Sequence, residues 1–117
     1  MIFDKYVELT IGGKAYKLCY PLRYVWEAER HLTDKSFIML MANAANGTPP
    51  NMGDIYTIFK YALLGGNPQL TEDDVEKLFL QALEDTDLLT LSQEAMKALQ
   101  KSGAFGKPKK EPAAPKA

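Results

Sequence analysis

Few residues in this chain are of a type and spacing that could do chemistry. His31 is the single histidine; it stands between Arg30 and Leu32 near the end of a predicted helix and belongs to no metal-binding motif. Cys19 is the single cysteine, which excludes an intrachain disulfide and any metal site built of cysteines alone. A cysteine in a strand is more often a small hydrophobe than a reactive thiol, so we expect an inert side chain.

An acidic cluster and two glycine pairs are the other chemical candidates. The acidic cluster consists of Glu72, Asp73, Asp74 and Glu76. Its spacing departs from that of a calcium loop, and a preference for negative charge in the first turn of a helix explains it. Gly12-Gly13 and Gly65-Gly66 are interpreted as turn residues, since neither pair begins a phosphate-binding loop. We therefore predict no catalytic, cofactor-binding or metal-binding residue, and no enzyme activity.

The elements that would position any functional surface begin with a β-hairpin. A two-residue turn at Gly12-Gly13 predicts an apolar face and a charged face. The predicted register pairs Val7 with Leu18, Leu9 with Tyr16, Glu8 with Lys17 and Tyr6 with Cys19. An isolated two-stranded ribbon is only marginally stable in water, so the apolar face must be covered by helices or by another chain.

Apolar residues at helical spacing predict five helices after the hairpin. They cover about residues 22–32, 36–44, 55–63, 71–83 and 88–102. The first helix carries Leu22, Val25, Trp26, Glu29 and Leu32 at helical spacing, and we expect it to lie across the apolar face of the hairpin. The predicted fold class is α+β: an N-terminal β-hairpin packed on a small bundle of four to five α-helices. Residues 1–103 form a single globular domain.

Residues 104–117 are predicted to form a flexible, disordered Lys/Pro/Ala tail. From Gly103 onward the sequence contains four lysines and a single acidic residue, Glu111, so the rest of the chain is acidic on balance. The tail is interpreted as a solubilising linker, with docking on a partner or contact with nucleic acid as alternatives; the overall charge does not favour a nucleic-acid-binding protein. No membrane span and no signal-peptide pattern is predicted, so we expect a soluble, intracellular protein.

Apolar residues outside the helical stripes suggest a surface for other chains. Tyr61 and Leu64 fall outside the apolar stripe of the third helix, and Tyr56 lies at its margin. On the fourth helix Leu80 points about 140° away from Val75. Together with the unpaired edge of the hairpin, these residues predict a partner-binding surface and self-association.

The order of these parts resembles a known family. The hairpin is followed by Leu22-Arg23 at a helix start, by the apolar segment 58–65, which contains Tyr-Ala-Leu-Leu-Gly, and by a Leu-Thr-acidic stretch within 68–78. This layout resembles, over roughly residues 6–85, the tail assembly chaperones of long-tailed (siphovirus-type) bacteriophages.

The resemblance implies a non-catalytic protein that binds and solubilises the tape measure protein during tail assembly. It further implies self-association, the major tail tube protein as a second candidate partner, and a location in the cytoplasm of the host bacterium rather than in the mature virion. Many family members exist in two lengths through a translational frameshift, and a folded body with a Lys/Pro/Ala tail resembles the short form. The alternative is a small phage or prophage regulatory adaptor that binds a host protein through the same surface.

Overall fold

The hairpin forms in the predicted register. The computed structural model describes residues 5–106, and its strands are β1 (Tyr6–Ile11) and β2 (Lys14–Cys19). They pair antiparallel, with Leu9 opposite Tyr16. Gly12 and Gly13 have φ angles of 59° and 80°. A two-residue hairpin turn needs positive φ at both central positions, which glycine adopts without a steric penalty.

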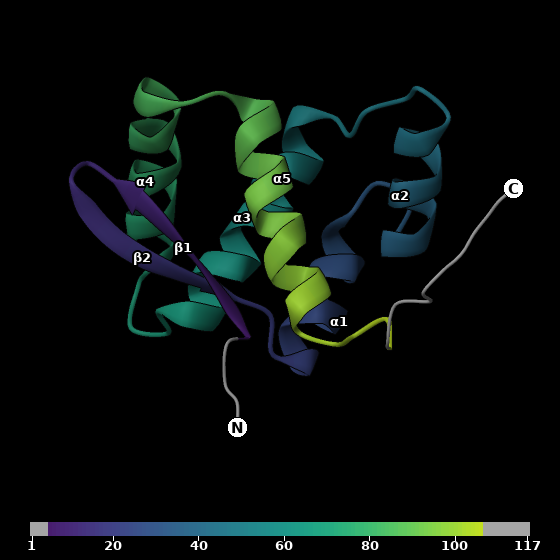
Figure 1. Ribbon diagram of the computed structural model, residues 1–117, viewed down its shortest axis with the longest axis horizontal. Coiled ribbons are helices and arrows are strands. Elements are labelled where there is room, and N and C mark those ends of the chain that lie inside the picture. Colours follow the sequence, from purple (N-terminus) through teal and green to yellow (C-terminus); the bar gives the residue numbers. More distant parts are fainter. Residues whose placement is uncertain (1–4, 107–117) are drawn as a thin grey trace, which may run out of the picture.

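Five helices follow the hairpin, as predicted (Figure 1). They are α1 (Leu22–His31), α2 (Phe37–Ala45), α3 (Met52–Gly66), α4 (Glu72–Asp85) and α5 (Leu88–Lys101). Side chains cap three of them at the predicted starts: Ser36 accepts a hydrogen bond in the first turn of α2, Thr71 and Asp74 form a capping box on α4, and Asp87 caps α5. The predicted α+β fold class is confirmed.

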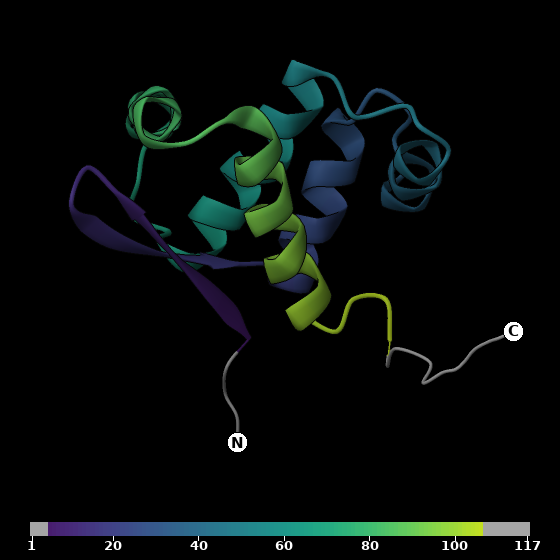
Figure 2. The same cartoon turned by 45° about the horizontal axis from the view of Figure 1, so that its top comes forward.

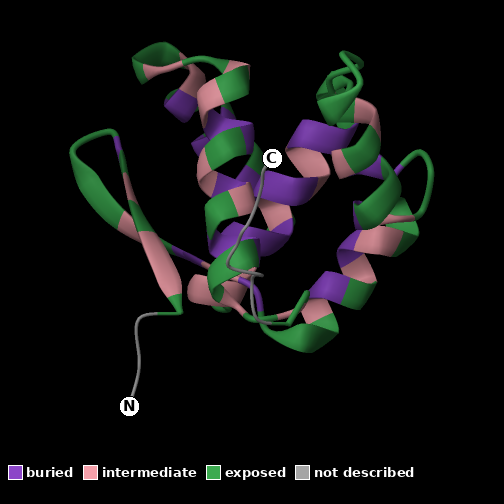
Figure 3. Ribbon diagram, turned by 45° about the vertical axis from the view of Figure 1, so that its right-hand side comes forward, coloured by how far each residue is buried: buried purple, intermediate pink, exposed green. Residues whose placement is uncertain are grey.

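The core lies between the hairpin, α3 and α5. Both strands pack against α5, β2 also packs along α3, and α4 contacts β1. Figures 1 and 2 show α5 crossing the middle of the molecule between the hairpin with α4 on one side and α2 on the other. Figure 3 shows the buried residues gathered on the central helices, while the turn of the hairpin is exposed. Fully buried residues include Leu18, Ile58, Phe59, Leu63, Leu91 and Leu99.

Two glycines bring the end of α3 against the backbone of β2. A Cβ atom on Gly65 would lie 1.9 Å from the carbonyl oxygen of Cys19, and one on Gly66 would lie 2.1 Å from that of Lys17. Both glycines are helical rather than turn residues, which corrects the sequence-based interpretation. Asn67 follows them and donates a side-chain hydrogen bond to the Lys17 carbonyl at 2.9 Å. The missing side chains therefore let the helix dock on the strand.

The first helix does not cover the hairpin, contrary to prediction. α1 packs on α3 instead, with Val25, Ala28 and Leu32 as its buried side. Leu22 and Trp26, predicted on the apolar stripe, are 54% and 58% exposed. The reason is that α3 and α5 already cover the apolar face of the hairpin. Helix α1 packs on the other side of α3 instead, and the face that it buries differs from the predicted one.

The packed body extends slightly past the predicted boundary at residue 103. Ala104 packs against the core, and the ring centroid of Phe105 lies 6.5 Å from that of Phe37 on α2. Residues 107–117 of the predicted tail lie outside the described residues.

Candidate partner-binding surface

The four predicted partner-binding residues differ in how far they are buried, and Leu80 alone among them is exposed. Tyr61 is buried, with 8% of its surface exposed, which corrects its placement outside the core. Its ring lies 6.0 Å from those of Tyr24 and His31, and it stacks on the imidazole of His31. Tyr61 is buried because α3 is central and packs on two sides: one against the hairpin and α5, the other against α1.

Tyr56 and Leu64 are half-buried and pack against the core. The ring of Tyr56 lies edge-on to Phe79, with centroids 5.1 Å apart. Its hydroxyl is the one buried side-chain polar atom without a hydrogen-bond partner among the described residues. Burial, reinforced by the nearby carboxylates of Glu76 and Glu72, raises the pKa of Tyr56 to about 12. These side chains contribute to packing more than to an open surface.

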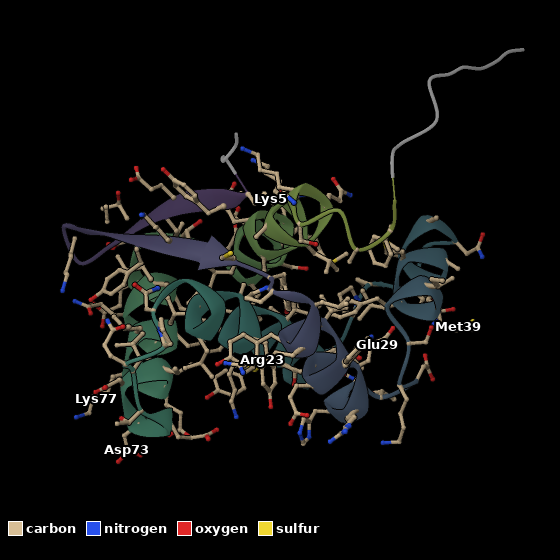
Figure 4. The ribbon with its side chains drawn as sticks, turned by 90° about the horizontal axis from the view of Figure 1, so that it is seen from below. Lys5, Arg23, Glu29, Met39, Asp73 and Lys77 are labelled. Carbon is tan, nitrogen blue, oxygen red and sulfur yellow. The ribbon has the colours of Figure 1, made fainter. Side chains whose placement is uncertain are left out.

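Leu80 is exposed, as predicted, with 63% of its surface accessible. It follows Asp73 and Lys77 at helical spacing on α4, and Figure 4 shows both charged side chains projecting from this helix. Leu80 lines neither of the two pockets described below. A single leucine among charged neighbours is common at protein surfaces, so Leu80 alone does not define a binding face.

The most apolar exposed element is α2. The chain carries no Asp, Glu, Lys or Arg from Ser36 to Gly53, a stretch that includes the whole of this helix. Phe37 and Leu40 are its buried residues, whereas Ile38 is 66% and Met39 is 49% exposed. Figure 4 shows Met39 at the end of the molecule opposite the charged face of α4. Depletion of charge together with exposed large apolar side chains is typical of protein interfaces.

A groove of about 420 Å³ runs between α2 and α5. Its walls include Leu40, Met41 and Ala44 on the α2 side and Leu89, Met96 and Gln100 on α5. Leu89 is 59% exposed at its rim. Methionine side chains are unbranched and polarisable, so they adapt to apolar partners of different shapes. The groove therefore has the dimensions and chemistry to receive apolar side chains of another helix.

A second pocket, of about 260 Å³, also has Leu40 in its wall and lies between the segment that follows α1, helix α2 and the start of α3. Its lining shares Leu40, Pro49 and Pro50 with the groove, and its other residues are polar except for Leu32. Asp34 and Asp54 bring two carboxylates into this lining, which contains no basic residue. The two pockets thus place an apolar surface beside an acidic one.

Among the residues first considered for chemistry, Cys19 and His31 line neither pocket. Cys19 is half-buried, and burial raises the pKa of its thiol above the ordinary value, which disfavours the reactive thiolate. Within residues 5–106 no three His, Cys, Asp or Glu side chains are grouped so as to hold a metal ion. In the same part of the chain no helix combines the length and apolar character needed to cross a membrane.

The groove was missed by sequence reasoning, although a signal for it was present. The absence of charge over residues 36–53 and the methionines at positions 39, 41 and 52 mark this segment as unusual for an exposed helix and loop. The pairing of α2 with α5, in contrast, joins residues about 50 positions apart and depends on the tertiary fold.

The chain matches no protein-family model, no curated protein and no solved structure in comparisons with each.

Proposed function

We propose that this protein is a non-catalytic tail assembly chaperone of a long-tailed bacteriophage, which binds and solubilises the tape measure protein before the tail tube forms around it. The observation that carries the proposal is the uncharged, methionine-lined groove between α2 and α5. The resemblance in the order of sequence motifs supplies the identity of the partner.

The groove suits an apolar face of a helix. Leu89, Met96 and Gln100 lie on one side of α5 at helical spacing, opposite Leu40 and Met41 of α2. A partner helix laid between them would bury the apolar residues that recur every three or four positions along it. Burying apolar area contributes roughly 25 cal/mol per Å² to binding. A long helical partner offers many such apolar faces, so several copies bound side by side would add their contributions.

Self-association is the second part of the proposal, because a chaperone that covers a long partner must line up many copies. The free edge of the hairpin lies away from the groove and is the candidate for contacts between copies. Sedimentation velocity over a wide concentration range is expected to show association that reverses on dilution; a strict monomer at the highest concentration would contradict this part.

The proposal predicts that a very long helical protein is encoded beside this gene, and co-expression with that protein is the test. We expect the partner to stay soluble with the wild-type chain and to be captured by it. Leu89→Glu, at the rim of the groove, should abolish capture while changing the free energy of unfolding by less than about 0.5 kcal/mol. Leu80→Glu is the matched control, since it introduces the same charge at a leucine of similar exposure on another helix.

Capture that survives Leu89→Glu would overturn the groove as the binding site, and loss with Leu80→Glu alone would move the site to α4. The rival function, a regulatory adaptor for a host protein, would use the same surface. A major tail protein gene upstream and a gene for a very long helical protein downstream favour the chaperone, and other neighbours favour the adaptor.

A further inference from the structure

The polar pocket beside the groove contains two carboxylates that no cation neutralises among residues 5–106. The ion pairs there are Arg30–Glu27, Lys60–Glu72 and Lys97–Glu94, so neither Asp34 nor Asp54 takes part in one. Lys35 is the nearest basic residue in sequence, but its Nζ donates to the carbonyl oxygen of Arg30 at 3.0 Å. The pocket thus has negative charge without an internal counterion.

Asp54 is held in place by hydrogen bonds, with only 8% of its surface exposed. Its Oδ1 accepts hydrogen bonds from the backbone N–H of Thr33 at 3.0 Å and from Thr33 Oγ1 at 3.1 Å. Its own N–H donates to Asn51 Oδ1 at 2.8 Å, and Asn51 Nδ2 donates to Thr33 Oγ1 at 3.1 Å. This network fixes the carboxylate in the pocket wall before anything binds.

The second oxygen of Asp54 is free. No hydrogen bond reaches Oδ2 from the described residues, and this atom is not sealed from solvent, because Tyr56 Oη is the one fully buried side-chain polar atom without a partner there. An acceptor oxygen that solvent reaches and that no protein donor occupies is open to a donor or a cation of a ligand. The free oxygen is therefore a point at which a ligand can be bound.

Asp34 provides the second carboxylate of the pocket. Its Oδ2 accepts from Asn43 Nδ2 on α2 at 3.1 Å, and Asp34 is otherwise exposed. Two carboxylates in one pocket attract a compact cation that can donate several hydrogen bonds, as a guanidinium or an ammonium group does. A metal ion would find fewer oxygen ligands in this pocket, since the side-chain carbonyl oxygen of Asn51 already accepts the N–H of Asp54.

We propose that this pocket receives the guanidinium or ammonium group of an arginine or lysine in the partner segment whose apolar residues lie in the α2–α5 groove. The inference rests on the proposed function, because it specifies the chemistry of the same partner. Leu40, Pro49 and Pro50 form a wall common to both cavities, so one segment can reach both. The site then selects helices in which a basic residue adjoins the apolar face.

A direct test uses methylguanidinium chloride as the probe and needs no partner. In NMR titrations of the full chain, we expect saturable shifts of the amides of Thr33, Asp34 and Asp54. Asp54→Asn keeps an oxygen for Thr33 but removes the charge, and should weaken binding about tenfold. Asp34→Asn, at the exposed carboxylate, should weaken it about threefold and serves if Asp54→Asn fails to fold. Asp73→Asn, on the far α4, is the control and should bind as the wild type does.

Three results of this titration would overturn the inference. They are the absence of saturable shifts in the pocket, equal binding by Asp34→Asn and the wild type, and tighter binding of Ca²⁺ than of methylguanidinium with shifts at the same amides. Removal of residues 107–117 tests the lysines of the chain itself as the occupant. If that removal strengthens methylguanidinium binding about tenfold, the pocket is filled from within and the inference is wrong.

Capture of the long helical protein separates this inference from the proposed function. We expect Asp54→Asn to weaken capture about tenfold, and Asp73→Asn to leave it unchanged. If Leu89→Glu abolishes capture while Asp54→Asn has no effect, the proposed function stands and the basic-residue site is wrong. If the wild-type chain captures nothing, the proposed function fails, while the methylguanidinium titration still reports on the pocket.

Discussion

The glycines at the end of α3 allow a sharp prediction about how the hairpin is held. Gly65→Ala would place a methyl carbon 1.9 Å from the carbonyl oxygen of Cys19. Non-bonded carbon and oxygen atoms approach to about 3.3 Å at closest, so helix and strand would have to separate by about 1.4 Å. Gly66→Ala meets the carbonyl of Lys17 at 2.1 Å and requires nearly the same separation.

The magnitude follows from two opposing effects. Alanine favours a helix over glycine by about 1 kcal/mol, which would stabilise either variant if the space were open. Overpacking costs about 1–3 kcal/mol when side chains can adjust, and more here, because both obstacles are backbone atoms of β2 and the adjoining Leu18 is fully buried. We therefore expect each substitution to lower the free energy of unfolding by about 3 kcal/mol, a large part of the stability of a domain of this size.

The assay is urea-induced unfolding followed by far-ultraviolet circular dichroism, with Gly53→Ala as the matched control. Gly53 lies in the first turn of the same helix, and a Cβ atom there would meet only Asn51 Oδ1, at the ordinary contact distance of 3.4 Å. This control should be as stable as the wild type or gain up to about 1 kcal/mol. If Gly65→Ala and Gly66→Ala behave like Gly53→Ala, the close approach of α3 and β2 is refuted.

Other predictions concern the core, the exposed helix surface and the tail. Phe59→Ala should lower the free energy of unfolding by about 3–5 kcal/mol and Tyr61→Glu by about 3 kcal/mol, whereas Leu80→Glu should change it by less than about 0.5 kcal/mol in the same urea melts. The pKa of the Tyr56 hydroxyl is about 12 in the folded chain, against the ordinary 10.0, so between pH 10 and 12 only the unfolded chain loses the hydroxyl proton. The free energy of unfolding should therefore fall as the pH rises through this interval, and it should fall less in Tyr56→Phe. Removing residues 107–117 should leave the thermal melt unchanged, because their sequence carries no periodic apolar residue.

Local sequence signals predicted the hairpin and the helix starts well. The Gly12-Gly13 turn determines which residues face each other across the strands, and Ser36 and Thr71 cap the helices that follow them, because these effects act within a few residues. Helix phase was less predictable. In α1 the spacing of Leu22 and Trp26 suits an apolar stripe, yet both side chains remain exposed. Which face of α1 is buried depends on the helix against which it packs, and the tertiary fold determines that contact.

The candidate site was harder to predict for the same reason. Tyr61 lies off the stripe that faces the hairpin, but a central helix has a second buried side, which no single-stripe pattern reveals. The groove and the acidic pocket combine residues from α2, α3, α5 and the loops on both sides of α2, so their existence depends on how these segments pack. The sequence did contain one signal, the absence of charge over residues 36–53, which indicates an apolar surface. The structure shows that α5 completes this surface as a groove.

The contact of both strands with α5 joins the first and the last elements of the described chain. During synthesis the hairpin emerges early, and its apolar face stays uncovered on one side until residues 88–101 have left the ribosome. Contacts this distant in sequence slow folding and make it an all-or-none event late in translation. A nascent chain stopped before α5 would therefore expose the hairpin to neighbouring chains, and productive folding would depend on translation reaching at least the end of that helix.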